Sequence, residues 1–270
     1  MNLFTPWENI ENYANAGAKK SQRTFLRLFL LSILAGMLIA FGGATAATAT
    51  HAVTNVSIQR LISGLLFPFG LGMVIISGAE LFTGNCLIAI SVLEKKTTLK
   101  KMLYNWVVVY FGNFVGAVIL AAGCAYFGQF DASAGALAVH SIKVAASKCA
   151  ISFPNGIVLG IFCNILVCMG VILSLSAKDV TGRIMGAYLP VALFVICGFE
   201  HCIANMYYVP AGIFALSVPK YAELALEAGI DVSAISWANF VFRNLVPVTI
   251  GNIIGGAGLG AVLRYGHKAN

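Results

Sequence analysis

The sequence predicts an all-α polytopic membrane protein with six transmembrane helices, built as two inverted three-helix repeats whose second and fifth helices are broken. Three observations lead to this fold class. Hydrophobic residues make up 59% of the 270-residue chain, charged residues only 10%, and the mean hydropathy is +0.88. Long apolar runs recur along the chain. A pair of polar motifs also occurs twice, in the same order each time.

The apolar runs give the spans in chain order. A helix of about 20 apolar residues crosses the ~30 Å hydrocarbon core of a bilayer. The second and fifth runs are interrupted by glycine and polar residues, so we expect broken helices there. The predicted spans cover residues 26–48, 61–93, 102–127, 155–176, 184–209 and 237–263.

Nearly the whole chain belongs to one membrane domain. We predict a cytoplasmic amphipathic helix at 1–25, a single transmembrane channel domain at 26–265 and a short cytoplasmic tail at 266–270. In the first segment Pro6, Trp7 and Glu8 come before Lys19 and Lys20. A cleavable signal peptide carries its positive charge earlier, so we expect this segment to remain in the protein.

The first repeated motif lies at the two breaks. Gly78-Ala-Glu-Leu-Phe-Thr-Gly-Asn85 and Gly198-Phe-Glu-His-Cys-Ile-Ala-Asn205 share the pattern Gly-x-Glu-x-x-x-x-Asn. Carboxylates and broken backbone at membrane depth are tolerated only where they are buried in protein or line a wet cavity. Two such breaks in corresponding places predict a permeation path.

The second repeated motif follows each break. Asn105 with Gly112-Asn113-Phe-Val-Gly116 recurs as Asn244 with Gly251-Asn252-Ile-Ile-Gly255. Chance similarity between glycine-rich apolar segments is the alternative, but two matches in one order favour duplication. Because each half holds three spans, the second repeat must be inverted relative to the first, and the breaks approach the membrane midplane from opposite sides.

The net charge of +7 is explained by membrane topology rather than by nucleic-acid binding. With both termini cytoplasmic, twelve of the seventeen basic residues lie on the cytoplasmic side. These twelve are Lys19, Lys20, Arg23, Arg27, Lys95, Lys96, Lys100, Lys101, Lys178, Arg183, Arg264 and Lys268.

Helix ends at the breaks direct backbone N–H groups toward the path, which favours a small anion as the substrate. The seven cysteines show no zinc-type spacing, and nothing indicates a metal or another cofactor. A membrane-embedded enzyme using Glu200, His201 and Cys202 is an alternative. We consider it weaker, because neighbouring side chains point in different directions.

These residues resemble the formate/nitrite transporter family of bacterial and archaeal small-anion channels. The resemblance is carried by Ala79-Glu-Leu-Phe-Thr83, Gly160-Ile-Phe-Cys-Asn164 with Leu166-Val-Cys168, Gly198-Phe-Glu-His-Cys-Ile-Ala-Asn-Met206 and the segment Asn244 to Gly256. It implies an aquaporin-like fold, a homopentamer with one pore in each protomer, and a bacterial or archaeal plasma or inner membrane.

The candidate central site consists of His201, Thr83 and Lys148. His201 is the histidine inside a predicted span, at the second break, and its ring titrates near physiological pH. Thr83 lies in the other break, where its hydroxyl suits capping a half-helix as well as contacting an anion. Lys148 precedes the fourth span, where it is either an ordinary snorkelling lysine or, as the resemblance implies, a charge beside the histidine.

Other residues near the breaks have supporting roles. We expect Glu80 and Glu200 to accept hydrogen bonds from backbone N–H groups of the breaks, and Asn164, Asn205 and Asn252 to support the loops. For any apolar residue here, helix packing is the simplest role. The resemblance implies an outer constriction of Phe67, Leu71 and Phe194 and an inner one of Leu81 and Phe82.

The resulting hypothesis is a channel for small monovalent anions. Formate is the first choice of substrate, followed by nitrite or hydrosulfide. An apolar ring opposes a bare anion more than its neutral conjugate acid, so proton sharing at His201 would assist passage. A proton-coupled symporter fits the same residues. The expected partners are therefore these anions, protons and the lipid bilayer.

Overall fold

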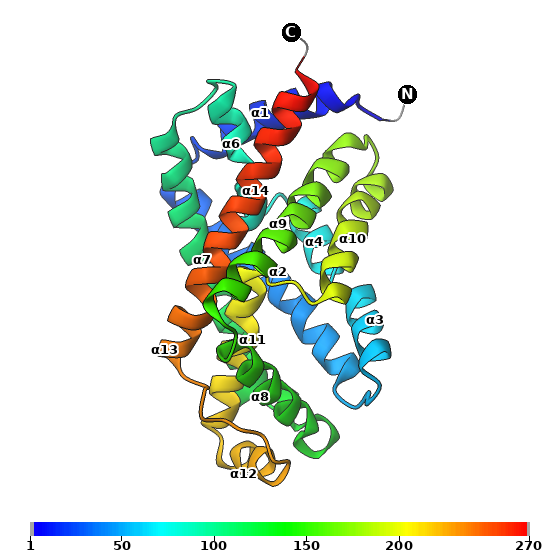
Figure 1. The fold of residues 1–270 in the computed structure, drawn as a ribbon, viewed down its shortest axis with the longest axis vertical. Helices are drawn as coiled ribbons and strands as arrows, with labels where there is room; N and C mark the ends of the chain where they lie inside the picture. The colour runs from blue at the N-terminus through cyan, green and yellow to red at the C-terminus, as the bar shows by residue number, and fades with distance from the viewer. Residues whose placement is uncertain (1–2, 269–270) are drawn as a thin grey trace.

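The computed structural model describes residues 3–268, which form helices joined by short connections (Figure 1). Residues 1–2 and 269–270, the outer ends of the predicted N-terminal segment and tail, lie outside the described residues. Six helices of the described part are long and apolar enough to cross a membrane, which confirms the predicted all-α polytopic class with six spans. They are α2 (Phe25–Thr50), α3 with α4 (Val56–Ser77), α7 (Leu99–Tyr126), α9 (Phe153–Ser176), α10 (Val180–Cys197) and the last, Trp237–His267.

Shorter elements fill the rest of the chain. Within the second span, α3 (Val56–Leu66) ends before Pro68, and α4 is Phe69–Ser77. The last span contains a π-helical segment, Phe240–Leu245, which ends two residues before Pro247, whose ring nitrogen cannot donate. The other elements are α1 (Pro6–Lys20), α5 (Phe82–Asn85), α6 (Ile88–Leu93), η1 (Gln129–Gly135), α8 (Ala136–Cys149), α11 (Cys202–Leu216), α12 (Pro219–Glu227), α13 (Trp237–Asn239) and α14 (Val246–His267).

Both ends of the described chain lie at the same end of the long axis, which we call the terminal end (Figure 1). Helix α1 lies across this end. Helices α8 and α12 lie at the opposite end, called here the far end (Figure 1). The predicted spans assign no element to these two segments, so α8 and α12 are additions to the predicted fold.

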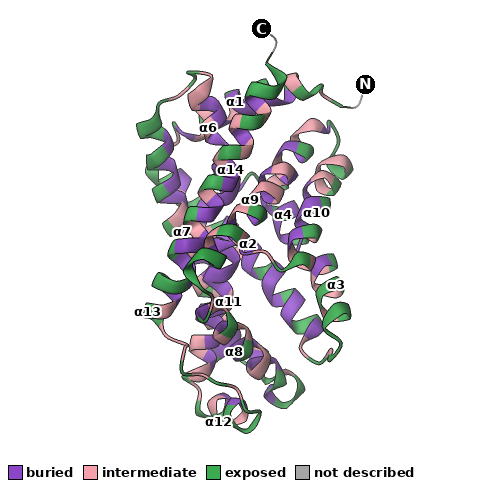
Figure 2. Cartoon of the chain, viewed as in Figure 1, coloured by how far each residue is buried: buried purple, intermediate pink, exposed green. Residues whose placement is uncertain are grey.

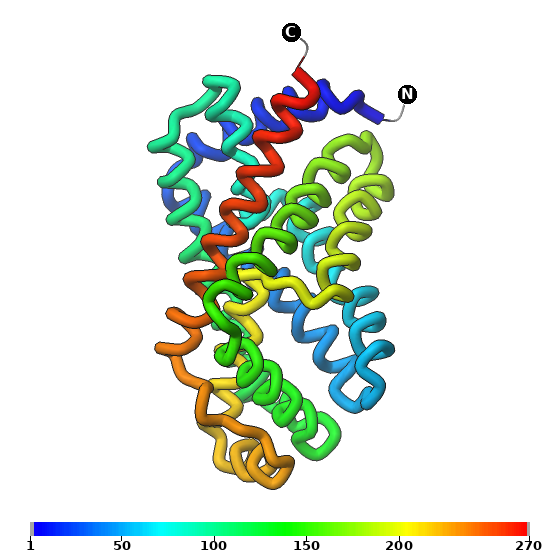
Figure 3. The backbone as a smooth tube through the Cα atoms, viewed as in Figure 1, coloured from blue at the N-terminus to red at the C-terminus, as the bar shows by residue number. Residues whose placement is uncertain are grey.

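Both broken helices end in the same way. Gly78 after α4 has φ 70° and Gly198 after α10 has φ 74°, the left-handed conformation that glycine adopts without a Cβ penalty. In each break the next residue closes a backbone hydrogen bond, Ala79 N–H to Val74 O at 3.1 Å and Phe199 N–H to Phe194 O at 3.0 Å. The extended segment after Gly198 crosses near the middle of the molecule, in yellow in Figure 3.

Burial follows the membrane-protein pattern. Buried positions line the helix contacts inside the molecule, and exposed positions lie on the outward faces (Figure 2). Many outward side chains are large and apolar, including Phe111 and Ile119 on α7 and Leu189 and Leu193 on α10. Such surfaces suit lipid or a neighbouring protomer.

The glycines of the second repeated motif lie where long helices cross. A Cβ at Gly116 would overlap the Ile33 carbonyl of α2, and one at Gly255 would overlap the Ile161 carbonyl of α9. Helices α7 and α14 therefore approach α2 and α9 backbone to backbone, as small residues allow in membranes.

Replacing Gly255 with leucine is expected to destabilise the fold, because the added side chain must push α14 away from α9. Overpacking of this kind costs about 1–3 kcal/mol or more. Thermal unfolding in mild detergent, followed by loss of the monodisperse size-exclusion peak, measures the effect. Gly258→Leu is the matched control, since a Cβ there meets no atom within 4 Å. Equal loss in both variants would contradict the packing role of Gly255.

Candidate functional site

The two breaks meet at a contact between Thr83 and His201. Thr83 Oγ1 and His201 Nε2 are 3.0 Å apart, and both residues are buried. Thr83 lies in the first turn of α5, and His201 is the N-cap residue of α11. The structure therefore brings together two of the predicted central residues, which are 118 positions apart in the chain.

The second ring nitrogen of His201 also makes a hydrogen bond. Nδ1 accepts a hydrogen bond from the Ala204 N–H at 3.0 Å and caps α11. An accepting Nδ1 places the proton of the neutral ring on Nε2, so Nε2–H donates toward Thr83 Oγ1. Protonation of Nδ1 would remove the cap. The fold thus favours a neutral His201 with one N–H donor directed at the meeting point.

Aromatic side chains flank the histidine. The Phe194 ring stacks on the His201 ring with centroids 5.7 Å apart and an interplanar angle of 13°. Phe67 packs edge-on against Phe194 at 5.8 Å. These two predicted constriction residues therefore lie together beside the central site.

The structure also defines the neighbours of the remaining predicted constriction residues. Leu71, assigned by resemblance to the outer group, lines a cavity together with Leu81 of the inner group. The Phe82 ring packs edge-on against Trp106 and Tyr110 of α7, at 6.2 and 4.9 Å.

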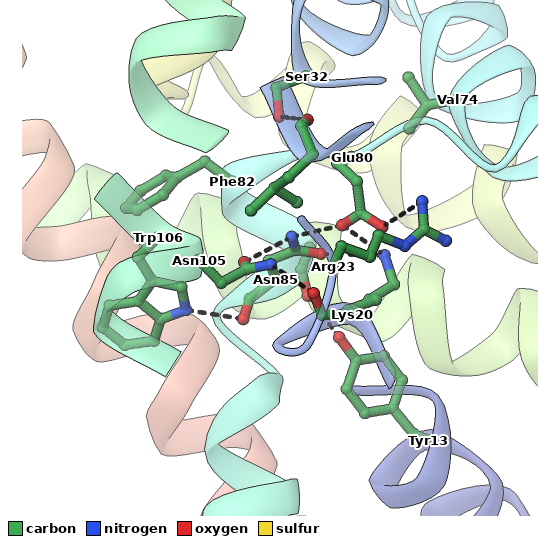
Figure 4. A network of polar contacts seen from close by, with 12 residues as sticks. Tyr13, Lys20, Arg23, Ser32, Val74, Glu80, Phe82, Asn85, Asn105 and Trp106 are labelled. Carbon is green, nitrogen blue, oxygen red and sulfur yellow. Dashed lines mark hydrogen bonds and ion pairs between the residues drawn. The ribbon is translucent and has the colours of Figure 1, made fainter. Parts of the chain in front are cut away.

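A charged network surrounds Glu80 on the side of the terminal end (Figure 4). Its carboxylate is fully buried and accepts from Lys20 Nζ at 3.1 Å and Asn85 Nδ2 at 2.7 Å, while Arg23 Nη1 lies 3.5 Å away. Asn85 also donates to Asn105, whose own amide donates to the Lys20 carbonyl at 3.2 Å. The negative charge of Glu80 is therefore balanced by two cations.

Glu200 has a matching network. Its carboxylate accepts from Lys148 Nζ at 2.7 Å and from Asn205 Nδ2 at 2.8 Å. Asn205 donates to Asn244, whose amide donates to the Lys148 carbonyl at 3.1 Å. Each contact has its equivalent around Glu80. The two halves of the chain therefore share their polar contacts as well as their motifs.

The backbone of each break is held by an asparagine of the following long helix. Asn113 Oδ1 accepts from the Phe82 N–H at 2.9 Å, and Asn252 Oδ1 accepts from the Cys202 N–H at 2.9 Å. Their Nδ2 groups donate to the Glu80 and Glu200 carbonyl oxygens, both at 2.9 Å. Each asparagine thereby satisfies a donor and an acceptor that the broken helix leaves unpaired.

These contacts correct the expectation for the two glutamates. Their carboxylates accept from lysine and asparagine side chains, not from backbone N–H groups of the breaks. Asparagine is better suited to pairing the backbone groups of the breaks, because a single amide offers both an acceptor and a donor. Asn164 bonds the loop too, donating to the Thr83 carbonyl at 3.2 Å and to the Asn252 carbonyl at 2.6 Å.

Lys20 is the residue that sequence reasoning missed. It ends α1 and contacts Glu80 as Lys148, near the end of α8, contacts Glu200. A signal was present, since Lys20 stands four residues before Thr24 and Lys148 four before Ser152, the N-cap residues of α2 and α9. Helix α1 thus corresponds to α8. The two lie at opposite ends of the molecule, which supports an inverted duplication (Figure 1).

A cavity of about 160 Å³ opens between the central site and α1. Tyr13 of α1 closes one side, donating its hydroxyl to the Gly84 carbonyl at 3.0 Å. Glu80, Leu71 and Leu81 form part of the wall, and the cations Lys20 and Arg23 also line it. This cavity offers an anion two positive charges on one side of the apolar region.

The cysteines do not form a metal site. In residues 3–268 no group of three histidine, cysteine or acidic side chains has metal-binding geometry. Cys202 is buried at the start of α11, while the Glu200 carboxylate is held by Lys148 and Asn205. The Glu200 carboxylate and the His201 ring therefore have different side-chain partners.

Replacing Lys148 with methionine is expected to lower the free energy of unfolding by several kcal/mol, because it leaves the mostly buried Glu200 carboxylate without its cation. Breaking a buried pair from one side costs about 3–5 kcal/mol. Chemical or thermal unfolding in detergent measures this loss. Adding Glu200→Gln should recover a large part of it, since the amide carries no charge. A double variant as unstable as Lys148→Met alone would contradict the charge-pair explanation.

Comparison with known proteins agrees with this geometry. The family described as "Formate/nitrite transporter" matches residues 7–266. The "Formate channel FocA" of Haemophilus influenzae is 35% identical over 270 residues, covering 97% of this chain and 94% of that protein. The "Probable formate transporter" of Methanothermobacter thermautotrophicus is 35% identical over 249 residues, covering 86% and 85%.

Solved structures share the architecture. One titled "Pentameric formate channel with formate bound" superposes with a TM-score of 0.79 at 34% identity, covering 89% of this chain and 96% of that one. An "FNT family ion channel" shares the fold with a TM-score of 0.83 at 24% identity, covering 97% and 99%. The family match and these relatives span almost the entire described chain, breaks included, so the chain belongs to the formate/nitrite transporter family.

Proposed function

We propose that this protein is a formate channel in which His201 shares its proton with the passing anion. The contact between Thr83 and His201 carries the proposal, because it places a single N–H donor where the two breaks meet. Relatives at 35% identity are named formate channels, and they support formate over nitrite and hydrosulfide.

Attraction of the anion is the first step. Lys20 and Arg23 together exceed the single negative charge of Glu80 on the side of the terminal end, and Lys148 balances Glu200 on the other side. Each lysine also neutralises a glutamate that would otherwise repel an anion. Positive potential at a narrow low-dielectric site raises the local anion concentration.

Passage of the apolar region is the second step. We assign the outer constriction to Phe67, Leu71 and Phe194 and the inner one to Leu81 and Phe82. These apolar side chains make desolvation of a bare anion costly. The anion replaces Thr83 Oγ1 as the acceptor of Nε2–H and also accepts from the threonine hydroxyl. Sharing this proton spreads the negative charge while Nδ1 keeps its cap on α11.

Complete proton transfer is the less favourable version. Complete transfer would leave Nε2 of His201 without a proton. Reprotonation of the ring at Nδ1 would require the Ala204 N–H to lose its acceptor. A proton-coupled symporter needs such a transfer in every cycle. The cap therefore favours a channel that shares a proton over a symporter that exchanges one.

The placement of the protein in the membrane follows from the charge distribution. We place both termini and α1 in the cytoplasm of a bacterial or archaeal cell, and the far end outside. The outward apolar faces of the long helices fit a homopentamer, the assembly named for the solved formate channel. In this arrangement α1 covers the cytoplasmic mouth, and residues 26–265 form the conducting unit.

Uptake by proteoliposomes tests the function directly. Formate should enter faster than nitrite or hydrosulfide at equal concentration, and faster at pH 5 than at pH 7, since more of the conjugate acid is present. Liposomes lacking the protein provide the baseline. Uptake of formate at the baseline rate at both pH values would overturn the proposed function, and faster uptake of another anion would reassign the substrate.

His201→Asn tests proton sharing without removing the helix cap, because an asparagine oxygen also accepts from the N–H of α11. We expect formate flux at pH 7 to fall about tenfold and flux at pH 5 to fall much less. The asparagine amide shares its proton less readily than the histidine Nε2–H, which weakens the charge-assisted hydrogen bond to formate by about 1.4 kcal/mol or more. Initial uptake rates across this pH range measure the change. His201→Ala, which loses cap and donor, is the comparison, and an unchanged pH profile in His201→Asn would refute the mechanism.

A further inference from the structure

The far end of the molecule contains a cavity of about 170 Å³ that none of the steps above uses. Helices α2, α3, α8, α10 and α11 contribute to its wall. Its lining consists of Ala46, Ala47, Thr50, Gln59, Arg60, Ser63, His140, Val144, Val195 and Tyr208. A cavity of this size holds a formate-sized anion with a few waters, since each water occupies ~30 Å³.

The cavity adjoins the central site. Val195 in its wall directly follows Phe194, whose ring stacks on His201. Ser63 in its wall lies one helical turn before Phe67, whose N–H donates to the Ser63 carbonyl at 2.9 Å. The wall of the cavity is therefore joined through α3 and α10 to the two aromatic residues beside the central site.

The charge of the lining favours an anion. Arg60 is its charged residue, and among the described residues of the wall there is no carboxylate. One end of the guanidinium lies near the last carbonyls of α10, with Nη1 3.4 Å from Ile196 O and 3.5 Å from Cys197 O. The remaining N–H groups of Arg60 are available to a ligand, because guanidinium carries five donors.

His140 adds a neutral donor. Burial is the main cause that lowers the pKa of His140 to about 4, and the nearby His51 and Lys143 lower it further. The ring is therefore neutral at physiological pH. His140 and Gln59 also line a second, larger cavity of about 980 Å³ at the far end, together with Lys143 and Asp231. These two side chains therefore stand between the larger outer space and the smaller inner one.

The internal repeat supports the same placement. Helix α8 corresponds to α1, with Val144 equivalent to Ala16 by the offset that relates Lys148 to Lys20. Ala16 lines the cavity at the terminal end, and Val144 lines the cavity at the far end. Each mouth thus has a cavity under the helix that covers it.

We infer that the cavity around Arg60 and His140 is a binding subsite for a small carboxylate or another monovalent oxyanion, occupied before the anion reaches Phe67 and Phe194. The inference rests on the proposed function and extends it by naming the residues that receive the anion at the far mouth. Arg60 supplies the charge, and His140 and Gln59 supply neutral donors at the passage from the larger cavity.

Charge-selective labelling of His140→Cys tests the subsite. The variant is treated from the far side with an impermeant methanethiosulfonate carrying either a sulfonate or a trimethylammonium group, and labelling is verified by mass. At formate concentrations far below saturation, the negative adduct should reduce the initial uptake rate at least about fivefold, because it repels the anion at short range. The positive adduct should reduce it less than about twofold.

The controls separate this subsite from other effects. Parent protein receives both reagents, since Cys197 is the exposed cysteine of the described chain. Lys220→Cys is a labelled position at the far end that lines neither cavity, and its uptake should not depend on the charge of the adduct. Val144→Cys lines the smaller cavity and replaces His140→Cys if that variant does not fold.

The outcomes are distinct. Equal inhibition by the two reagents, or no inhibition after complete labelling, overturns the subsite. Formate should also slow the labelling of His140→Cys by the negative reagent, and this protection can be read whether or not the protein conducts. Parent protein that fails to conduct formate would instead count against the proposed function.

Discussion

Two interruptions of the backbone inside the membrane are the constraint on which the rest of the structure depends. A helix that ends there leaves N–H and carbonyl groups with no water to satisfy them, and each unpaired group costs several kcal/mol in hydrocarbon. Asn113 and Asn252 resolve this with one amide each, pairing a donor and an acceptor of the break. The glycines of the same motif let the helices that carry these amides approach closely enough to make the bonds.

The charged residues around the breaks also help to define the loop structure. Buried carboxylates would exclude an anion, yet Glu80 and Glu200 orient Asn85 and Asn205 and so help to define the loops. Lys20 and Lys148 balance these carboxylates and leave neutral to positive surroundings on both sides of His201. The ion pairs that help to define the loops therefore also keep the breaks free of net negative charge.

The histidine illustrates how folding restricts chemistry. A free imidazole titrates near neutral pH and can act as donor, acceptor or base. As the N-cap of α11, His201 has one nitrogen committed to the Ala204 N–H, and its other nitrogen faces Thr83. The ring becomes a fixed donor. The fold therefore holds a single N–H donor of a titratable ring at the point where the two breaks meet.

The sequence by itself determined the class, the six spans, both breaks and the pairing of the motifs, because hydropathy, length and glycine placement are local properties of the chain. It also singled out His201 and Thr83, because polar residues at membrane depth are costly unless they are paired or line a cavity. Partners far apart in the chain were decided by the tertiary structure. It paired lysine with glutamate, asparagine with the backbone of the breaks, and Phe82 with Tyr110 of α7. Side-chain direction depends on how helices pack, and no spacing along the chain records that.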